Sequence, residues 1–160
     1  MAKKVRLYKE GDWFAVPLRS GRFALGLIAR VGTRGGIILG YFFGPQRENR
    51  PNKTDTIGLH RDDAALIRQF CDPGLVSGEW PIIFRPEKWQ RSDWPLPTFG
   101  HIDIVNSNKA YRREYGNNLS DLFVHEELIT LEEAQHLPAD GLDGHIALQI
   151  RLTQVLSTQL

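Results

Sequence analysis

The sequence predicts an α+β fold, with a strongly curved antiparallel sheet in the N-terminal two-thirds and two helices near the C-terminus. Short runs of β-branched and aromatic residues alternate with glycine-containing turns over the first 45 residues, which is the pattern of an antiparallel meander. Two of these runs are apolar at nearly every position, so both faces of the sheet should be covered, as in a small half-barrel. Helical periodicity begins only at residue 130.

The expected strands are separated by turn residues. The turns RSGR (19–22) and TRGG (33–36) divide the first three strands, which are expected at residues 12–18, 23–32 and 37–44. A polar loop follows at 45–56, and residues 60–65 could hold one short helical turn. Further strands are expected at 65–71, 80–84, 101–105 and 109–115, whereas the structure of 122–128 is ambiguous from its pattern.

Two helices are expected at the C-terminus. Residues 130–137 begin with a capping box, in which the Thr130 hydroxyl accepts a backbone hydrogen bond and the Glu133 carboxylate accepts one in return. Residues 144–156 form an amphipathic pattern: Ile146, Ile150 and Thr153 lie on one stripe, with Leu148, Leu152, Val155 and Leu156 beside it.

The length and composition predict one globular domain over residues 1–160. Apolar residues make up 41% and charged residues 24% of the 160 residues, which are ordinary values for a globular protein. No apolar run approaches the roughly 20 residues that cross a bilayer, and the basic start has no apolar stretch behind it, so neither a membrane span nor a signal peptide is expected. A single cysteine, Cys71, fits a reducing cytoplasm.

The net charge of +1 hides an asymmetry along the chain. Residues 1–50 contain ten Lys/Arg and three Asp/Glu, whereas residues 101–160 contain four and nine. The two ends could pair with each other, attract nucleic acid, or attract a protein of opposite charge.

No template for catalysis or metal binding fits the sequence. The five histidines lack the spacing of a zinc site, and Cys71 has no local partner base. The glycines of residues 32–36 lie between strands and do not form a phosphate-binding loop. Paired carboxylates at 62–63, 126–127 and 132–133 lie in polar contexts, where solvation or helix capping is expected. The sequence therefore predicts no enzyme, no catalytic residue, no metal and no cofactor.

One alternative is a small nucleic-acid-binding module. Arginines interleaved with aromatic residues on a sheet suit stacking on bases and contact with phosphates. The residues concerned are Arg19, Arg22, Arg30, Arg34, Arg47 and Arg50, with Trp13, Phe14, Phe42 and Phe43. The acidic last third opposes this alternative, so nucleic acid is not the expected partner.

Residues 79–100 contain three of the four tryptophans and four prolines. Trp80 precedes an apolar strand and is expected in the core. Trp89 and Trp94 lie among charged residues in a loop that proline stiffens, which suits either a binding hot spot or a lid over an open barrel end. Trp89, Arg91, Asp93 and Trp94 are therefore candidate partner-binding residues.

Several segments together resemble immunity protein family 26 of bacterial polymorphic toxin systems, and the first strand is also similar to SH3-like barrels. The segments are GDWFAVPL (11–18), GRFALGLIARVG (21–32), GYFFGP (40–45), GLVSGEWPII (74–83), DWPLPTFG (93–100) and EELITLEEAQHLPADGLDG (126–144). The resemblance implies a non-enzymatic protein that binds the C-terminal domain of a cognate toxin and protects the producing cell in competition between bacteria. It transfers no catalytic or contact residue.

If the toxin carries a basic substrate groove, the acidic C-terminal third is the natural contact face. The candidates there are Glu126, Glu127, Glu132 and Glu133, together with Asp121, Asp140 and Asp143. One alternative is that these carboxylates only cap and solvate the two helices. Against a toxin with exposed anionic groups, the Arg-rich N-terminal sheet would serve as the contact face instead.

Overall fold

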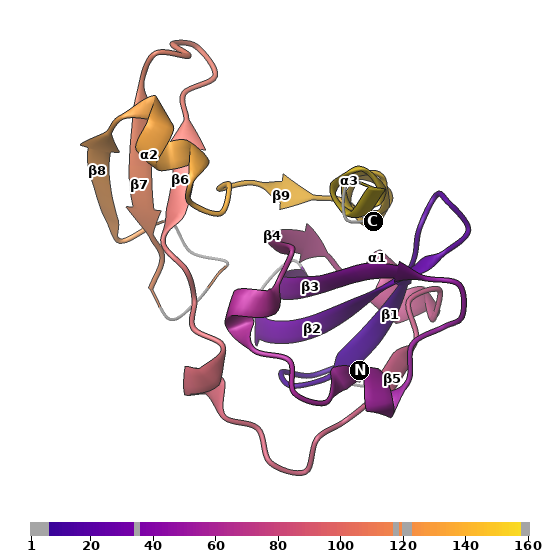
Figure 1. Cartoon of the computed structure of the whole chain (residues 1–160). Coiled ribbons are helices and arrows are strands. Elements are labelled where there is room, and N and C mark those ends of the chain that lie inside the picture. Colours follow the sequence, from indigo (N-terminus) through magenta and orange to yellow (C-terminus); the bar gives the residue numbers. More distant parts are fainter. Residues whose placement is uncertain (1–6, 34–35, 117–118, 120–122, 158–160) are drawn as a thin grey trace, which may run out of the picture.

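The computed structural model describes residues 7–33, 36–116, 119 and 123–157. Across these ranges the chain forms a six-stranded sheet, a separate three-stranded sheet and three α-helices (Figure 1). Two of the three helices lie near the C-terminus, so the predicted α+β class is confirmed.

The larger sheet is built on the predicted antiparallel meander. Its four central strands are β1 (Trp13–Pro17), β2 (Phe23–Val31), β3 (Ile37–Arg47) and β4 (Leu66–Cys71). The strand β5 (Ile82–Phe84) pairs with β1 at one edge, and the short β9 (Leu142–Asp143) runs parallel to β4 at the other. Because β5 and β9 are not joined, the sheet is open and does not close into a barrel. The SH3-like topology stays a prediction.

Short helical elements occupy the connections. The loop from β3 to β4 contains two 3₁₀ turns, η1 (Lys53–Thr56) and η2 (Arg61–Asp63), the second of which is the helical turn predicted within 60–65. The predicted turn after β4 is a short helix, α1 (Pro73–Ser77). It ends at Gly78, whose φ of 82° lies in the left-handed region that glycine adopts without strain.

Both faces of the larger sheet are buried, as the apolar runs predict. Successive side chains of a strand point to opposite faces, so each strand contributes to two separate clusters. One cluster contains Phe14, Ile28, Ile38, Phe42 and Phe70. The other contains Trp13, Leu25, Leu27, Leu39, Tyr41 and Phe43. None of these side chains is more than 6% exposed, so each face needs a cover from elsewhere in the chain.

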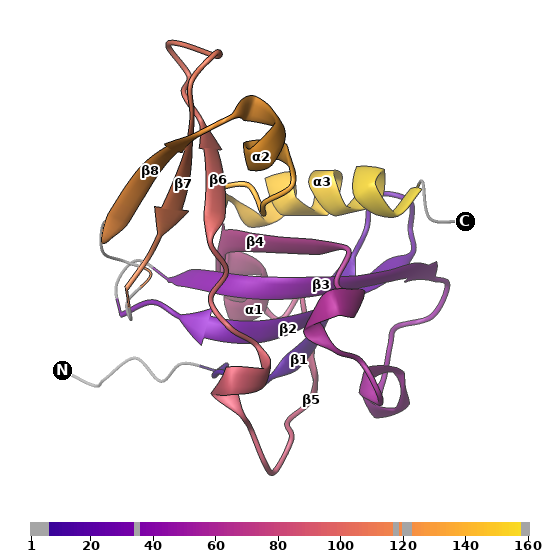
Figure 2. The same cartoon turned by 60° about the vertical axis from the view of Figure 1, so that its left-hand side comes forward.

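The helix α3 (His145–Ser157) covers the first face (Figure 2). Leu148, Leu152 and Leu156 follow each other at intervals of four residues and pack into the first cluster. Ile146 and Ile150 lie on the outer side and are 42% and 44% exposed. The predicted amphipathic helix is confirmed, and its buried stripe is the leucine stripe.

The tryptophan-rich segment passes around the edge of the sheet and covers both faces. Trp80 lies before β5 and stacks on Phe14 in the first cluster, with 6.0 Å between ring centroids. Trp94 lies after β5 and contacts Trp13, Tyr41 and Phe43 in the second cluster, edge to face. The short strand β5 thus separates tryptophans that serve opposite faces.

The smaller sheet and one helix form a hairpin lobe, which we define as residues 99–140. Its strands are β6 (Phe99–Ile102), β7 (Ala110–Glu114) and β8 (His125–Ile129), and its helix is α2 (Leu131–Gln135). A Cβ at Gly100 would lie 2.4 Å from the Ala134 carbonyl oxygen, so glycine lets α2 pack directly on β6. The predicted capping box of α2 is confirmed by hydrogen bonds of 3.1 Å in both directions between Thr130 and Glu133.

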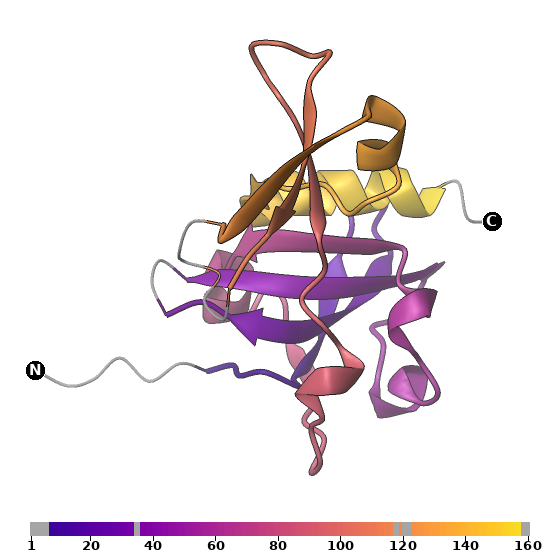
Figure 3. The same cartoon turned by 90° about the vertical axis from the view of Figure 1, so that its left-hand side faces the viewer.

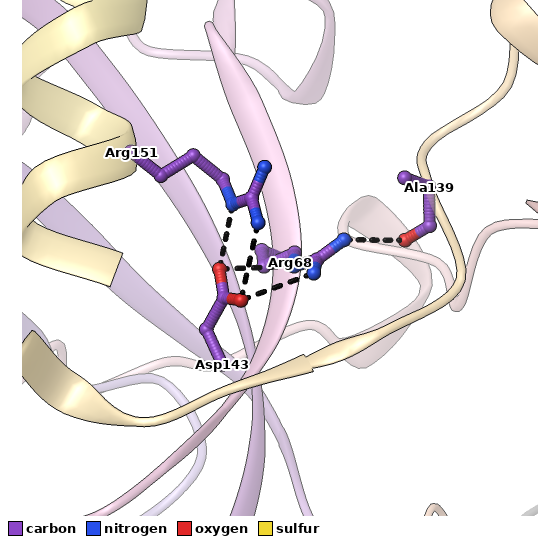
Figure 4. A network of polar contacts seen from close by, with 4 residues as sticks. All are labelled: Arg68, Ala139, Asp143 and Arg151. Carbon is purple, nitrogen blue, oxygen red and sulfur yellow. Dashed lines mark hydrogen bonds and ion pairs between the residues drawn. The ribbon is translucent and has the colours of Figure 1, made fainter. Parts of the chain in front are cut away.

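A buried ion-pair network ties the last part of the chain to the larger sheet (Figure 4). Asp143 in β9 accepts hydrogen bonds from Arg68 in β4, at 3.1 Å from both Nε and Nη2, and from Arg151 in α3, at 2.7 and 3.3 Å. Arg68 Nη1 also donates to the carbonyl of Ala139. Burial alone raises the pKa of the Asp143 carboxyl, but hydrogen bonds from Arg151 and Arg68 outweigh it, so this pKa lies below its ordinary value.

Replacing Asp143 with asparagine is expected to lower the free energy of unfolding by about 3–5 kcal/mol at neutral pH, because Arg68 is left buried without its counter-charge. A carboxyl with a lowered folded-state pKa stabilises the fold above its unfolded pKa of about 3.9, and this contribution disappears as the pH falls through the folded-state pKa. The difference between the two proteins should therefore shrink below a pH of about 4. Urea unfolding across this pH range measures it.

The matched control is Glu127→Gln, which breaks the exposed Arg112–Glu127 pair. Its expected cost is only about 0–1 kcal/mol, because solvent screens exposed pairs. Equal costs for the two variants would contradict the structural role of the Asp143 network.

Trp80→Ala and Trp94→Ala are each expected to lower the free energy of unfolding by about 3–5 kcal/mol, because each leaves a large cavity in one cluster. Trp89→Ala should cost less, since its side chain is only half-buried. Chemical denaturation of the three variants provides the comparison. A loss below about 1 kcal/mol for Trp94→Ala would mean that its ring is not a core element.

Candidate partner-binding surfaces

A cleft of about 630 Å³ opens between η2 and the 3₁₀ turn η3 (Arg91–Asp93). Its lining is mostly polar and consists of Gly58, Leu59, His60, Arg61, Asp62, Ser92, Asp93 and Trp94. The Tyr41 hydroxyl donates to the Pro95 carbonyl at 2.5 Å and holds one wall in place. Burial raises the pKa of this phenol, so it stays protonated and keeps donating at neutral pH.

The structure divides the first group of predicted contact residues. Trp94 is 8% exposed and fills the second cluster, so the interpretation as a partner contact is not supported for its ring. Trp89 packs inward as a partly buried member of the same cluster, over Gly11, where a Cβ would lie 3.1 Å from the indole. Arg91 is exposed and forms a salt bridge of 2.9 Å with Glu10. Asp93 is exposed and lines the cleft, so its partner role stays a prediction.

The predicted acidic contact residues lie on the hairpin lobe, and most of them have local partners. Glu126 and Glu127 pair across strands with Arg113 at 3.5 Å and Arg112 at 3.1 Å. Glu133 caps α2, whereas Glu132 is exposed and forms no ion pair with another described residue. The capping role agrees with the alternative for Glu133. Glu126 and Glu127 lie in a strand rather than a helix, and their partner role stays a prediction, as does that of Glu132.

The remaining acidic candidates do not form an open face. Asp140 accepts from the Tyr115 hydroxyl at 2.7 Å and pairs with Arg113 at 3.1 Å. Burial and then this hydrogen bond raise the pKa of the Tyr115 phenol. Asp143 is 6% exposed within its arginine network, which corrects its placement on a contact face. Asp121 lies outside the described residues.

The basic and acidic ends of the chain do not neutralise each other directly. Among the residues that the structure describes, no ion pair joins residues 1–50 to residues 101–160. The C-terminal carboxylates pair with Arg68, Arg112, Arg113 and Arg151 instead. Across the described residues, the basic and acidic ends are therefore not paired with each other.

The predicted base-stacking platform is not presented to solvent. Trp13 is 6% exposed, Phe14 and Phe42 are fully buried, and Phe43 is 2% exposed. Arg19, Arg22 and Arg50 are exposed, and Arg30 and Arg47 are half-buried, whereas Arg34 lies outside the described residues. Without accessible rings beside these arginines, the sheet lacks the stacking component of a nucleic-acid site.

The sequence did not reveal the tip of the hairpin lobe as a candidate surface. Residues 101–105 were expected to form a strand, but β6 ends at Ile102, and residues 103–109 form a projecting turn (Figure 3). The signal for this turn was present in the Asn-Ser-Asn sequence at 106–108 and in Asp103 before it. Ile104 and Val105 are thereby brought into solvent.

Within the described ranges, no group of three or more His, Cys, Asp or Glu side chains is arranged to hold a metal ion. No helix in the same ranges is long and apolar enough to cross a membrane.

The family model described as immunity protein 26 matches residues 9–111, which is 103 of the 160 residues. The matched range begins before β1 and ends within β7, so it contains the four central strands, the tryptophan-rich segment and the projecting turn. No curated protein and no solved structure matches the chain significantly. Five of the six segments that indicated the resemblance lie within this range, whereas residues 126–144 lie beyond it. The predicted family is confirmed, and the chain belongs to the immunity protein 26 family.

Proposed function

We propose that this chain neutralises a toxin by binding it. The partner is the C-terminal toxin domain of a cognate polymorphic toxin, and binding inhibits that domain and protects the cell that produces both proteins. The observation that carries the proposal is the family match over residues 9–111, since the family is described as immunity proteins.

The roles of the ionisable side chains support binding rather than catalysis. Asp12 is buried and forms a salt bridge of 3.2 Å with Arg85, and Asp143 is held by two arginines. Glu133 caps a helix. Carboxylates engaged in this way stabilise the fold and are poorly placed to transfer protons to a substrate.

The site of action that we propose is the cytoplasm of the producing cell. A protein that protects its own cell must meet the toxin before the toxin reaches its substrate, and it must bind faster than the toxin acts. Charge complementarity accelerates such an encounter by steering the two surfaces together. The uneven charge of this chain supplies a steering field, whichever sign the toxin surface carries.

Co-expression in a susceptible bacterium tests the function. The proposal predicts that a neighbouring gene encodes a toxin domain that arrests growth when it is expressed alone. The wild-type chain should restore growth when both are made in the cytoplasm. Trp80→Ala, which is expected to destabilise the fold, should protect less well at elevated temperature. A toxin domain from an unrelated system serves as the specificity control. Growth arrest that persists despite ample folded chain would contradict the proposal.

A further inference from the structure

The tip of the β6–β7 hairpin exposes two adjacent apolar side chains. Ile104 is 92% exposed and Val105 is 96% exposed, the highest values among the exposed large apolar side chains described. The tip projects beyond the neighbouring elements in all three views (Figures 1, 2 and 3). Single exposed apolar residues are common on protein surfaces, but a contiguous apolar feature marks a candidate interaction site.

Hydrogen bonds hold the tip in one conformation. One carboxylate oxygen of Asp103 accepts from the backbone N–H groups of Val105, at 2.8 Å, and Asn106, at 3.2 Å. The backbone of Lys109 closes the turn by accepting from Asp103 N–H at 3.0 Å and donating to Asn106 C=O at 2.9 Å. Because the turn is already ordered, its apolar side chains lose little conformational entropy when they are buried against a partner.

A mostly apolar hollow of about 410 Å³ adjoins the tip. It lies between β6 and residues 134–140, which are the end of α2 and the segment that follows it. Its apolar lining consists of Ile102, Ile104, Ala134, Leu137 and Ala139. Ile102 is itself 42% exposed. A partner can enclose the exposed side chains of the tip and can insert a side chain of its own into the hollow. Interfaces with paired hot spots have this arrangement.

The charge around this surface determines the chemistry of the partner. Residues 99–140 contain eight Asp/Glu and three Lys/Arg, a balance of −5, whereas the rest of the chain contains eleven and seventeen, a balance of +6. Asp103, Glu114 and Glu132 belong to this lobe and form no ion pair with another described residue. An acidic lobe with an apolar tip is complementary to a basic surface that contains an apolar socket.

We propose that the lobe tip binds a basic surface of the cognate toxin domain. Ile104 and Val105 at the tip insert into an apolar socket there, and Ile102 and Leu137 in the adjoining hollow complete the contact. This inference rests on the proposed function. A basic surface of this kind is what an enzyme uses to hold a polyanionic substrate, so the lobe excludes that substrate by occupying its place.

The other exposed surfaces fit a partner less well. The cleft between η2 and η3 carries both signs of charge, with Arg61 beside Asp62 and Asp93, and Trp94 is its one aromatic group. On the outer side of α3, Ile146 and Ile150 are each less than half exposed. Neither surface joins a projecting apolar feature to a lobe in which acidic residues outnumber basic ones.

The first experiment removes the apolar tip. The probe is an inactive form of the toxin domain encoded by the neighbouring gene, and affinity is measured by calorimetry or surface binding. The double variant Ile104→Ser with Val105→Ser should bind roughly 30-fold more weakly or worse, the effect of losing at least one hot spot. Its melting temperature should be unchanged, because the side chains contact little in the free protein. Ile57→Ser, which alters another isoleucine that is 72% exposed, should retain affinity within about twofold.

The second experiment tests the charge. Glu132→Lys should slow association severalfold at low salt and have little effect at high salt, whereas Asp93→Lys in the cleft should leave association unchanged. If the wild-type chain binds the toxin domain and the double tip variant binds it equally tightly, the tip proposal is overturned and the proposed function is not. A larger effect of Asp93→Lys than of Glu132→Lys also overturns it and assigns the contact to the cleft. Failure of the wild-type chain to bind or neutralise the toxin domain overturns the proposed function, and the tip proposal with it.

Discussion

The burial of both faces of the central sheet is the constraint on which the rest of the structure depends. Residues 24–29 of β2 and 38–43 of β3 are buried on both faces, and a sheet of this kind is stable only when two separate layers cover it. The chain supplies most of both layers after its last central strand, with Tyr8 and Leu59 contributing from earlier segments. The leucines of α3 and Trp80 cover one face, and Trp94, Phe99 and Leu119 help to cover the other. The prolines and tryptophans of residues 79–100 are therefore explained by packing: the segment must pass around an edge and place a large ring on each side.

The polar interactions then fix these covering layers in position. Asp143 joins β4, β9 and α3 through two guanidinium groups, so the helix that covers one face is bound to the edge of the sheet that it covers. Arg113 has the corresponding role in the hairpin lobe, where it reaches Glu126 and Asp140 and lies 4.4 Å from the Phe123 ring centroid. Arginine suits both positions because its planar group binds two acceptors at once. These internal pairs engage Glu126, Asp140 and Asp143, and they leave Glu132 without an ion pair to another described residue.

The sequence predicted the features that depend on local pattern. The meander, the capping box at Thr130 and Glu133, and the amphipathic C-terminal helix are all confirmed, because periodicity and turn chemistry encode them directly. The features that depend on tertiary contacts were not predictable from one sequence. The loop context of Trp94 resembles that of an exposed hot spot, and only the fold brings it against Trp13 and Tyr41. The sequence context of Asp143 predicts a surface carboxylate, because Arg68, its partner in the fold, lies 75 residues earlier in the chain. Ile104 and Val105 show the converse case, because their composition is that of a buried strand and the fold exposes them.

Because the central sheet has no open face, a partner must meet a peripheral part of the molecule, and the part that we propose is the hairpin lobe. Hydrogen exchange of the chain, alone and bound to the inactive toxin domain, tests this claim most directly. The account predicts slower exchange in the complex for backbone amides of residues 100–112 and 125–137, with the amides of β1 to β4 unchanged. Protection confined to residues 58–62 and 91–94, or to α3, would contradict it.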